Sequence, residues 1–183
     1  MPVEIEVKIA VPNPGAARRL LRRKGFVVVK PRVFESNEVF DTSDLRLRNS
    51  RSLLRIREVR HQAKLTYKGP PAAAKHKSRE ELELKTDDGR TLAAIFNRLG
   101  FERVFRYEKY RTEFQREKTG IVTLDETPIG MYLELEGPPA WIDRTARLLG
   151  FHEKDYILES YGKLYLDWCA RRRRKPGDMI FGA

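Results

Sequence analysis

The sequence predicts a mainly β domain of the α+β class, in which antiparallel strands form either a sandwich or a closed barrel. Roughly eight or nine segments alternate between apolar and charged residues with a period of two, which is typical of strands with two unlike faces. Most of these segments follow one another through short connections, and this favours antiparallel pairing. So many strands in 183 residues, of which 40% are hydrophobic, indicate one domain with a shared core.

The first half of the chain is expected to form strands and one helix. Residues 3–11 (VEIEVKIAV) alternate throughout and predict the first strand. Asn13 and Pro14 suit the N-cap and first turn of a helix, which should end near Gly25. The further strands expected here are two extended segments on either side of Pro31, at 26–30 and 33–41, and a tightly connected pair at 52–60 and 62–68.

The second half combines further strands with helices. A loop is expected at 70–78 (PPAAAKHKS), and strands are expected at 79–85, 102–116, 120–126 and 130–136. A helix is expected from Asp87 to Leu99 and should end at Gly100. Two more helices are expected, one after Pro138 and Pro139 and one from about residue 158 onward. The last helix carries a stripe at i, i+3, i+4 and i+7, which predicts a face packed on the sheet; its members are Tyr161, Leu164, Tyr165 and Trp168.

The charge balance predicts a polyanionic partner. The chain has 37 basic and 26 acidic residues, for a net charge of +11. Part of the excess is one run, Arg171–Lys175, so the rest of the chain is only moderately basic with both signs interspersed. Because a groove that only tracks nucleic acid would need fewer acids, this balance argues against nucleic acid as the partner. We expect a domain at 1–169 and a basic C-terminal tail at 170–183, whose basic run is a solvated helix end.

Several kinds of site and location are not expected from this sequence. A single cysteine, Cys169, excludes an internal disulfide framework and a cysteine-rich zinc site. His61, His76 and His152 have no metal-ligand spacing and are expected at the surface. The chain has no apolar run long enough to cross a bilayer and no signal-peptide layout, so a cytoplasmic location without a membrane partner is expected.

Charged side chains recur on one face of nearly every predicted strand. They include Glu4, Glu6 and Lys8, Arg55 and Arg57, Lys64 and Lys68, Arg79, Glu81 and Glu83, Lys109 and Arg111, Asp125, and Glu134 and Glu136. One interpretation is a one-sided sheet with a solvated outer face. The other places the charged faces inside a barrel and the apolar faces against the helices, which requires that opposite charges pair or that a metal and a polyanion neutralise them.

The second interpretation fits one kind of chemistry. Carboxylates at i and i+2 project side by side, and oxygen ligands suit Mg²⁺ or Mn²⁺ rather than zinc. Rows of arginine and lysine suit phosphate oxygens, which arginine can bind in a bidentate manner. A cation together with such rows is what phosphoryl or nucleotidyl transfer requires, because its transition state carries spread negative charge.

The order of the charged motifs resembles the CYTH superfamily, the triphosphate tunnel metalloenzymes. The matching segments are Glu4-x-Glu6-x-Lys8, Phe40-Asp41-Thr42, Leu54-Arg55-Ile56-Arg57, Lys68-Gly69-Pro70, Arg79-Glu80-Glu81-Leu82-Glu83, Lys109-x-Arg111, Leu124-Asp125, Glu134-x-Glu136 and Ser160-Tyr161. This family includes class IV adenylate cyclases, thiamine triphosphatases, inorganic tripolyphosphatases and fungal RNA triphosphatases. The resemblance covers residues 3 to 165, and it implies a closed antiparallel eight-stranded β-barrel with helices packed outside and a triphosphate in the tunnel.

The resemblance also implies a role for each matching residue. Mg²⁺ or Mn²⁺ would be held by Glu4, Glu6, Glu134 and Glu136, with Asp125 assisting. The triphosphate would be held by Lys8, Arg55, Arg57, Lys68, Arg79, Lys109 and Arg111. Lys8 and Glu6 would lie at the reacting end as catalytic residues. Glu81 and Glu83 would either bind a second metal ion or pair with tunnel cations.

Three functions follow from these residues. The first is a metal-dependent triphosphatase acting on tripolyphosphate, ATP or thiamine triphosphate, although Val39-Phe40 stands where some thiamine-triphosphatase-like members have a tyrosine. The second is a class IV adenylate cyclase, which converts ATP to cyclic AMP and pyrophosphate and needs the same charges. The third is a non-catalytic polyphosphate or RNA binder, against which the four glutamates argue because they would repel an anion. A homodimer is left open.

Overall fold

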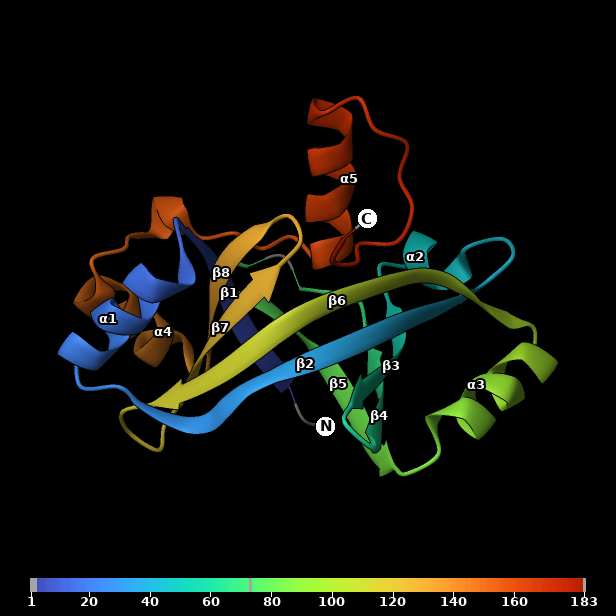
Figure 1. The fold of residues 1–183 in the computed structure, drawn as a ribbon, viewed down its shortest axis with the longest axis horizontal. Helices are drawn as coiled ribbons and strands as arrows, with labels where there is room; N and C mark the ends of the chain where they lie inside the picture. The colour runs from blue at the N-terminus through green and yellow to red at the C-terminus, as the bar shows by residue number, and fades with distance from the viewer. Residues whose placement is uncertain (1–2, 73, 183) are drawn as a thin grey trace.

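The computed structural model describes residues 3–72 and 74–182, which form a closed antiparallel barrel with helices outside it (Figure 1). The strands are β1 Val3–Val11, β2 Val27–Thr42, β3 Leu53–Val59, β4 Gln62–Lys68, β5 Lys77–Thr86, β6 Phe101–Gln115, β7 Ile121–Thr127 and β8 Gly130–Glu136. The helices are α1 Pro14–Arg23, α2 Arg46–Asn49, α3 Gly89–Arg98, α4 Pro139–Leu149, α5 Tyr161–Arg171 and the 3₁₀ turn η1 Glu153–Asp155. Four residues lie outside the described part of the chain: Met1 and Pro2 of the predicted domain, Ala73 of the predicted loop and Ala183 of the predicted tail.

The barrel confirms the predicted fold class. Its strands follow the order β1-β5-β4-β3-β2-β6-β7-β8, and β8 closes the barrel against β1. The two long strands β2 and β6 run side by side across the molecule (Figure 1). No helix in the described part of the chain is long and apolar enough to cross a membrane.

Three elements differ from the sequence-based expectation. Pro31 does not divide two strands but lies inside β2, where the register with β6 shifts, because a proline without an N–H is tolerated at such an irregularity. Strand β5 begins at Lys77, so the loop that precedes it is shorter than predicted. The short helix α2 was not predicted; the buried carboxylate of Asp41 fixes it by accepting hydrogen bonds from the N–H groups of Leu47 and Arg48, each at 2.9 Å.

The charged faces of the strands point inward, and the apolar faces point outward, most of them against the helices, whereas Leu82 and Leu84 of β5 are exposed. Helices α1 and α4 cover β1, β7 and β8, and the core between them contains Val7, Ile9, Leu21, Phe114, Val122, Leu124, Leu133, Leu135, Trp141 and Ile142. Gly120 allows the Trp141 ring to approach the sheet, because a Cβ atom at this position would lie 2.6 Å from the ring. The interpretation of the charged faces as a solvated outer surface is therefore wrong.

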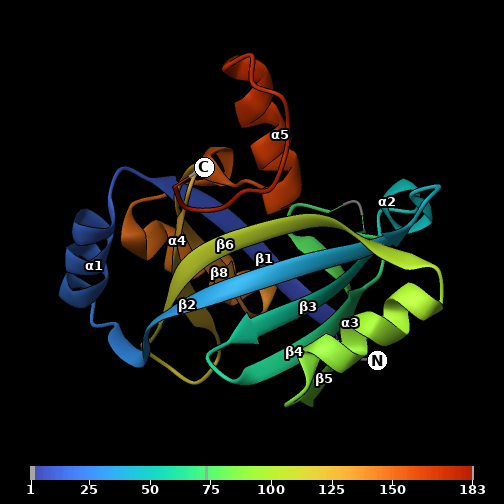
Figure 2. The same cartoon turned by 45° about the vertical axis from the view of Figure 1, so that its right-hand side comes forward.

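Helix α5 stands over one end of the barrel, as Figure 2 shows. The predicted stripe packs on the barrel at its N-terminal end, where the Tyr161 ring lies 5.6 Å from that of Tyr132, while Trp168 stacks on Tyr165 farther along the helix. After the basic run the chain returns to β6. The buried Met179 exchanges backbone hydrogen bonds with Arg106 and Glu108, each at 2.9 Å, so the end of the chain is tied to the barrel wall.

Candidate active site

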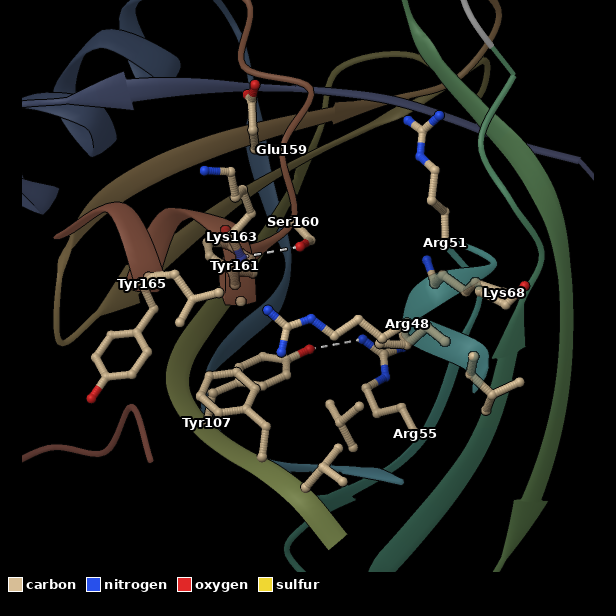
Figure 3. Close-up of a pocket in the computed structure, with 18 of the residues that line it drawn as sticks. Arg48, Arg51, Arg55, Lys68, Tyr107, Glu159, Ser160, Tyr161, Lys163 and Tyr165 are labelled. Atoms are coloured by element: carbon tan, nitrogen blue, oxygen red, sulfur yellow. Dashed lines mark hydrogen bonds between the residues drawn. The ribbon is translucent and has the colours of Figure 1, made fainter. Parts of the chain in front are cut away.

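The barrel encloses a cavity of about 1100 Å³ that opens beneath α5 and α2 (Figure 3). Of the residues predicted for the site, ten line it: Glu4, Glu6, Lys8, Arg55, Arg57, Lys68, Arg79, Lys109, Arg111 and Glu134. Asp125 lies behind this wall, fully buried, and Glu136 lies at an exposed position outside the lining. Cationic side chains outnumber the carboxylates along the wall, so the cavity is suited to a polyanion.

Glu6 is the centre of the first charged group in the cavity. Its Oε1 atom accepts hydrogen bonds from Lys8 Nζ at 3.1 Å and from Lys77 Nζ at 2.8 Å, and all three side chains are buried. Burial alone would raise the pKa of Glu6, but the charges of Lys8 and Lys77 outweigh it and lower that pKa. Lys8 also pairs with Glu134 at 3.2 Å, so strands β1, β5 and β8 are joined by charge at this point.

Asp125 is the centre of the second group. Its carboxylate accepts hydrogen bonds from Lys109 at 2.7 Å, from Arg111 Nε at 2.7 Å and Nη2 at 2.6 Å, and from the Tyr161 hydroxyl at 2.8 Å. Arg111 also contacts Glu134, which links this group to the first. The carboxylate therefore holds two cations and one hydroxyl in fixed positions by direct hydrogen bonds.

A third group lies on β2, β3 and β6. Arg57 Nε donates to Asn37 Oδ1 at 3.0 Å and lies 3.4 Å from Glu35. Arg55 donates to the Tyr107 hydroxyl at 3.1 Å, as Figure 3 shows, and it also donates to Thr66. Both guanidinium groups are thus oriented from behind by neutral and acidic partners on neighbouring strands.

Some buried polar atoms in this cavity have no hydrogen-bond partner. Across residues 3–72 and 74–182, the unpaired ones include the Nε atoms of Arg55 and Arg79 and the Oε2 atom of Glu35. The nearest carboxylate to Arg79 Nε is Glu4, at 3.8 Å. Because an unpaired buried donor costs free energy, an added acceptor oxygen at either of these two Nε atoms would be favourable.

Three carboxylates approach one another where β1 pairs with β8. Glu6 and Glu136 are register partners on these strands, and Glu4 precedes Glu6 on β1. Partial desolvation and then the charges of Glu4 and Glu6 raise the pKa of Glu136 to about 7. Oxygen donors with this mutual repulsion fit a divalent cation chemically. In the described part of the chain, however, no three acidic, imidazole or thiol groups are already arranged as ligands of one ion, because Glu4 contacts Lys68 and Glu6 contacts Lys8 and Lys77.

The outer part of the cavity is different in character, and we call it the vestibule. It lies between α2 and α5 and is lined by Leu47, Arg48, Arg51, Phe105, Tyr165 and Leu166, with Pro176–Asp178 on the returning chain. The ring of Phe105 stacks between those of Tyr107 and Tyr165, with centroids 5.7 Å from each. Apolar and aromatic surface thus adjoins the charged tunnel, with arginines at its edge (Figure 3).

Several residues of this site were not found from the sequence. Glu35 and Asn37 lie on a strand whose faces were not assigned, although their alternation with Phe34 and Ser36 follows the same period of two. Lys77 was placed in a loop, and Tyr161 was interpreted as part of an apolar stripe. His76 is buried and bonded to Asp143 rather than exposed, so its predicted surface position is wrong.

Comparisons with known proteins agree with this fold. The family model described as "CYTH domain" matches residues 2–161. A protein of Methanocaldococcus jannaschii named "Putative adenylate cyclase MJ0240" is 30% identical over 157 residues, which cover 86% of this chain and 84% of that protein.

Solved structures of similar shape include three from different sources. The PH1819 protein of Pyrococcus horikoshii has a TM-score of 0.77 and 25% identity, covering 90% of this chain and 98% of its own. A Vibrio parahaemolyticus protein with a TM-score of 0.77 and 20% identity covers 88% and 96%. A Hippeastrum protein, described as "Putative adenylyl cyclase HpAC1 from Hippeastrum reveals a dominant triphophatase activity", has a TM-score of 0.65 and 19% identity, covering 96% and 98%. At these identities the last two share the fold alone with this chain.

Proposed function

The chain belongs to the CYTH domain family, and from this premise we propose that it is a divalent-metal-dependent enzyme that hydrolyses a triphosphate held in its barrel. The observation that supports the proposal best is the set of cations on β1, β3, β4, β5 and β6 that face one cavity. Two of these arginines have buried Nε donors that find no hydrogen-bond partner among the described residues, and phosphate oxygens would satisfy them. A cytoplasmic location remains a prediction.

We assign the phosphate-binding role to the cations on the cavity wall. These are Lys8, Arg55, Arg57, Lys68, Arg79, Lys109 and Arg111, to which the geometry adds Lys77. The carboxylate oxygens of Asp125 already accept hydrogen bonds from Lys109, Arg111 and Tyr161. We therefore propose that Asp125 orients the two cations, instead of assisting in metal binding as the family resemblance implied. Their fixed positions would lower the reorganisation needed when negative charge spreads over the transferred phosphoryl group.

The metal is assigned to the glutamates of β1 and β8. Glu4, Glu6, Glu134 and Glu136 offer the oxygen donors that Mg²⁺ or Mn²⁺ prefers. When bound, such an ion would neutralise phosphate charge and activate a water molecule. Glu6 and Lys8 are the catalytic residues of this proposal: Glu6 orients Lys8 and Lys77 through its Oε1 atom, and Lys8 places a buried ammonium against the developing charge.

A second candidate function is the cyclisation of ATP, and one observation favours ATP or another organic triphosphate as the substrate. The vestibule offers aromatic and apolar surface next to the tunnel, which inorganic tripolyphosphate would leave empty and a nucleoside triphosphate could fill. The vestibule therefore favours an organic triphosphate as the substrate. The name of the M. jannaschii relative supports cyclisation, whereas the description of HpAC1 supports hydrolysis.

The proposal is tested by product analysis. Purified protein is incubated with tripolyphosphate, ATP or thiamine triphosphate and with Mg²⁺ or Mn²⁺, and orthophosphate, pyrophosphate and cyclic AMP are separated and measured. We expect orthophosphate release that stops when the metal is chelated. Equal amounts of pyrophosphate and cyclic AMP from ATP would instead establish the cyclase. Absence of turnover of every triphosphate with both metals would refute both reactions.

The vestibule gives a prediction of its own. Replacing Tyr165 by alanine removes a ring that stacks on Phe105, so the KM for ATP is expected to rise about tenfold while the kinetics with tripolyphosphate stay unchanged. Steady-state rates with both substrates measure this. Tyr110→Ala, which removes an aromatic ring of β6 outside the cavity lining, is the control. Equal losses for both substrates would show that the ring supports α5 rather than the base.

A further inference from the structure

A cluster of polar residues outside the barrel is joined through one carboxylate. Asp143 lies on α4, directly after the buried Trp141 and Ile142, which anchor that helix to the barrel. Its Oδ1 atom accepts hydrogen bonds from His76 Nε2 at 2.8 Å and from the Tyr156 hydroxyl at 2.9 Å, and Lys75 lies 3.1 Å from its Oδ2 atom. Partial burial raises the pKa of Asp143, but the hydrogen bonds from His76, Lys75 and Tyr156 outweigh this effect and lower that pKa to about 2. The side chain is therefore an ionised carboxylate that accepts hydrogen bonds from all three residues.

This cluster lies beside a seam in the barrel. Strand β1 pairs with β5 only from Val3 to Glu6, opposite Glu80 to Lys77. At Lys8 both backbone hydrogen bonds go to Ile157, at 3.0 and 2.8 Å, while β8 occupies the other edge of β1. Beyond Glu6, therefore, a single residue of the chain between α4 and α5 takes the place of β5.

Two of the three residues that contact Asp143 come immediately before the two residues that flank this seam. His76 precedes Lys77, whose ammonium reaches Glu6 at 2.8 Å. Tyr156 precedes Ile157, which fixes the backbone of Lys8, and the ammonium of Lys8 reaches the same oxygen of Glu6 at 3.1 Å. The carboxylate of Asp143, outside the barrel, thus contacts both chain segments whose neighbouring lysines reach Glu6 inside the barrel.

We propose that Asp143 is a positioning residue for the candidate active site, which it serves by holding His76 and Tyr156 so that Lys77 and Lys8 converge on Glu6. The proposal rests on the proposed function only for its catalytic consequence. Lys77 is the first residue of β5 and pairs with Glu6 of β1, whereas the described loop residues just before it belong to no helix or strand. The bond from His76 to Asp143 therefore holds the chain at the point where this strand begins. Asp143, His76 and Tyr156 do not line the cavity and are expected to act through the lysines alone.

The test measures the accessibility of individual lysines in the full-length protein. Acetylation rates with an N-hydroxysuccinimide ester are followed by mass spectrometry for wild type and Asp143→Ala. We expect the rate at Lys77, which is 7% exposed, to rise about tenfold while the rate at Lys109, which is 1% exposed, stays constant. Arg144→Ala, on the neighbouring residue of α4 with only a 3.8 Å contact to Glu117, is the matched control and should change neither rate.

Two further variants separate positioning from general support. His76→Leu should raise the Lys77 rate as Asp143→Ala does, and His76→Gln, which keeps a donor near the position of Nε2, should restore it. For the triphosphate that the wild type hydrolyses, kcat of Asp143→Ala should fall about tenfold with KM within about twofold, because the arginines of β3 and β6 are untouched.

Each other outcome overturns the assignment. Three results would show that the cluster only stabilises the outside of the barrel. They are an unchanged acetylation rate at Lys77 in Asp143→Ala, an equal rise in the rate at Lys109, and a His76→Gln variant that behaves like His76→Leu. The labelling needs no substrate, so a wild type without triphosphate turnover would refute the proposed function while the labelling still decides the role of Asp143.

Discussion

Glu6→Gln is expected to lower the rate of triphosphate turnover about 10²- to 10³-fold while the barrel stays folded. Glutamine keeps the size of the side chain but removes the negative charge that two buried ammonium groups share, at 2.8 and 3.1 Å. Lys77, whose pKa burial and the charge of Lys8 already lower to about 8, loses the carboxylate that raises it and will release its proton more readily. The variant therefore loses a carboxylate oxygen that could bind a metal ion, and it also loses the fixed positive charge of Lys77.

The measurement is the steady-state rate of product release under saturating metal, with circular dichroism as the check on folding. Glu102→Gln, an exposed glutamate of β6, is the matched control and should retain full activity. A folded Glu6→Gln protein with undiminished turnover would remove Glu6 from both the metal site and the catalytic pair.

Asp125→Ala is expected to lower the free energy of unfolding by about 3–5 kcal/mol, the largest stability effect that we predict. The carboxylate is fully buried and is the acceptor for Lys109, Arg111 and Tyr161. Its removal leaves one ammonium and one guanidinium in the barrel without this counter-charge. The penalty comes from these uncompensated cations, since Glu134 and Glu35 can offset only part of it.

Urea unfolding followed by tryptophan fluorescence measures this free energy. Asp87→Ala, at an exposed position before α3, is the control and should stay within about 0.5 kcal/mol of the wild type. A loss below about 1 kcal/mol in Asp125→Ala would mean that solvent in the cavity replaces the carboxylate. The orienting role that we assign to Asp125 would then be wrong.

Strand periodicity predicted which charged side chains lie on the same face of a strand, but it did not decide whether these faces line a cavity. Glu6 and Arg111, more than a hundred positions apart, were each assigned to a charged face by their alternation with apolar residues. The resemblance to a known family then chose a closed barrel over a sandwich, which periodicity alone could not do. The direction of a face, inward or outward, is set by what covers its other side, and that depends on α1 and α4.

The residues that the sequence did not place share a physical reason. Lys77 lies at the start of a strand whose beginning is fixed by pairing with β1 and by the bond from His76 to Asp143, both of which join distant parts of the chain. Tyr161 belongs to an apolar helical stripe, yet its hydroxyl reaches Asp125 inside the barrel. Such roles follow from tertiary contacts, which local pattern does not encode.

The order of strands around the barrel has a consequence for how the chain folds during its synthesis. Among the strands of this barrel β1 is made first and β8 last, yet the two are neighbours. The buried Lys8 of β1 cannot pair with Glu134 until β8 has been made. Such long-range closure makes folding slow, and until then the edge of β1 that later pairs with β8 is open to other chains. Charged side chains on an open strand oppose association, so the alternating glutamates and lysine of the candidate active site also act against aggregation during this interval.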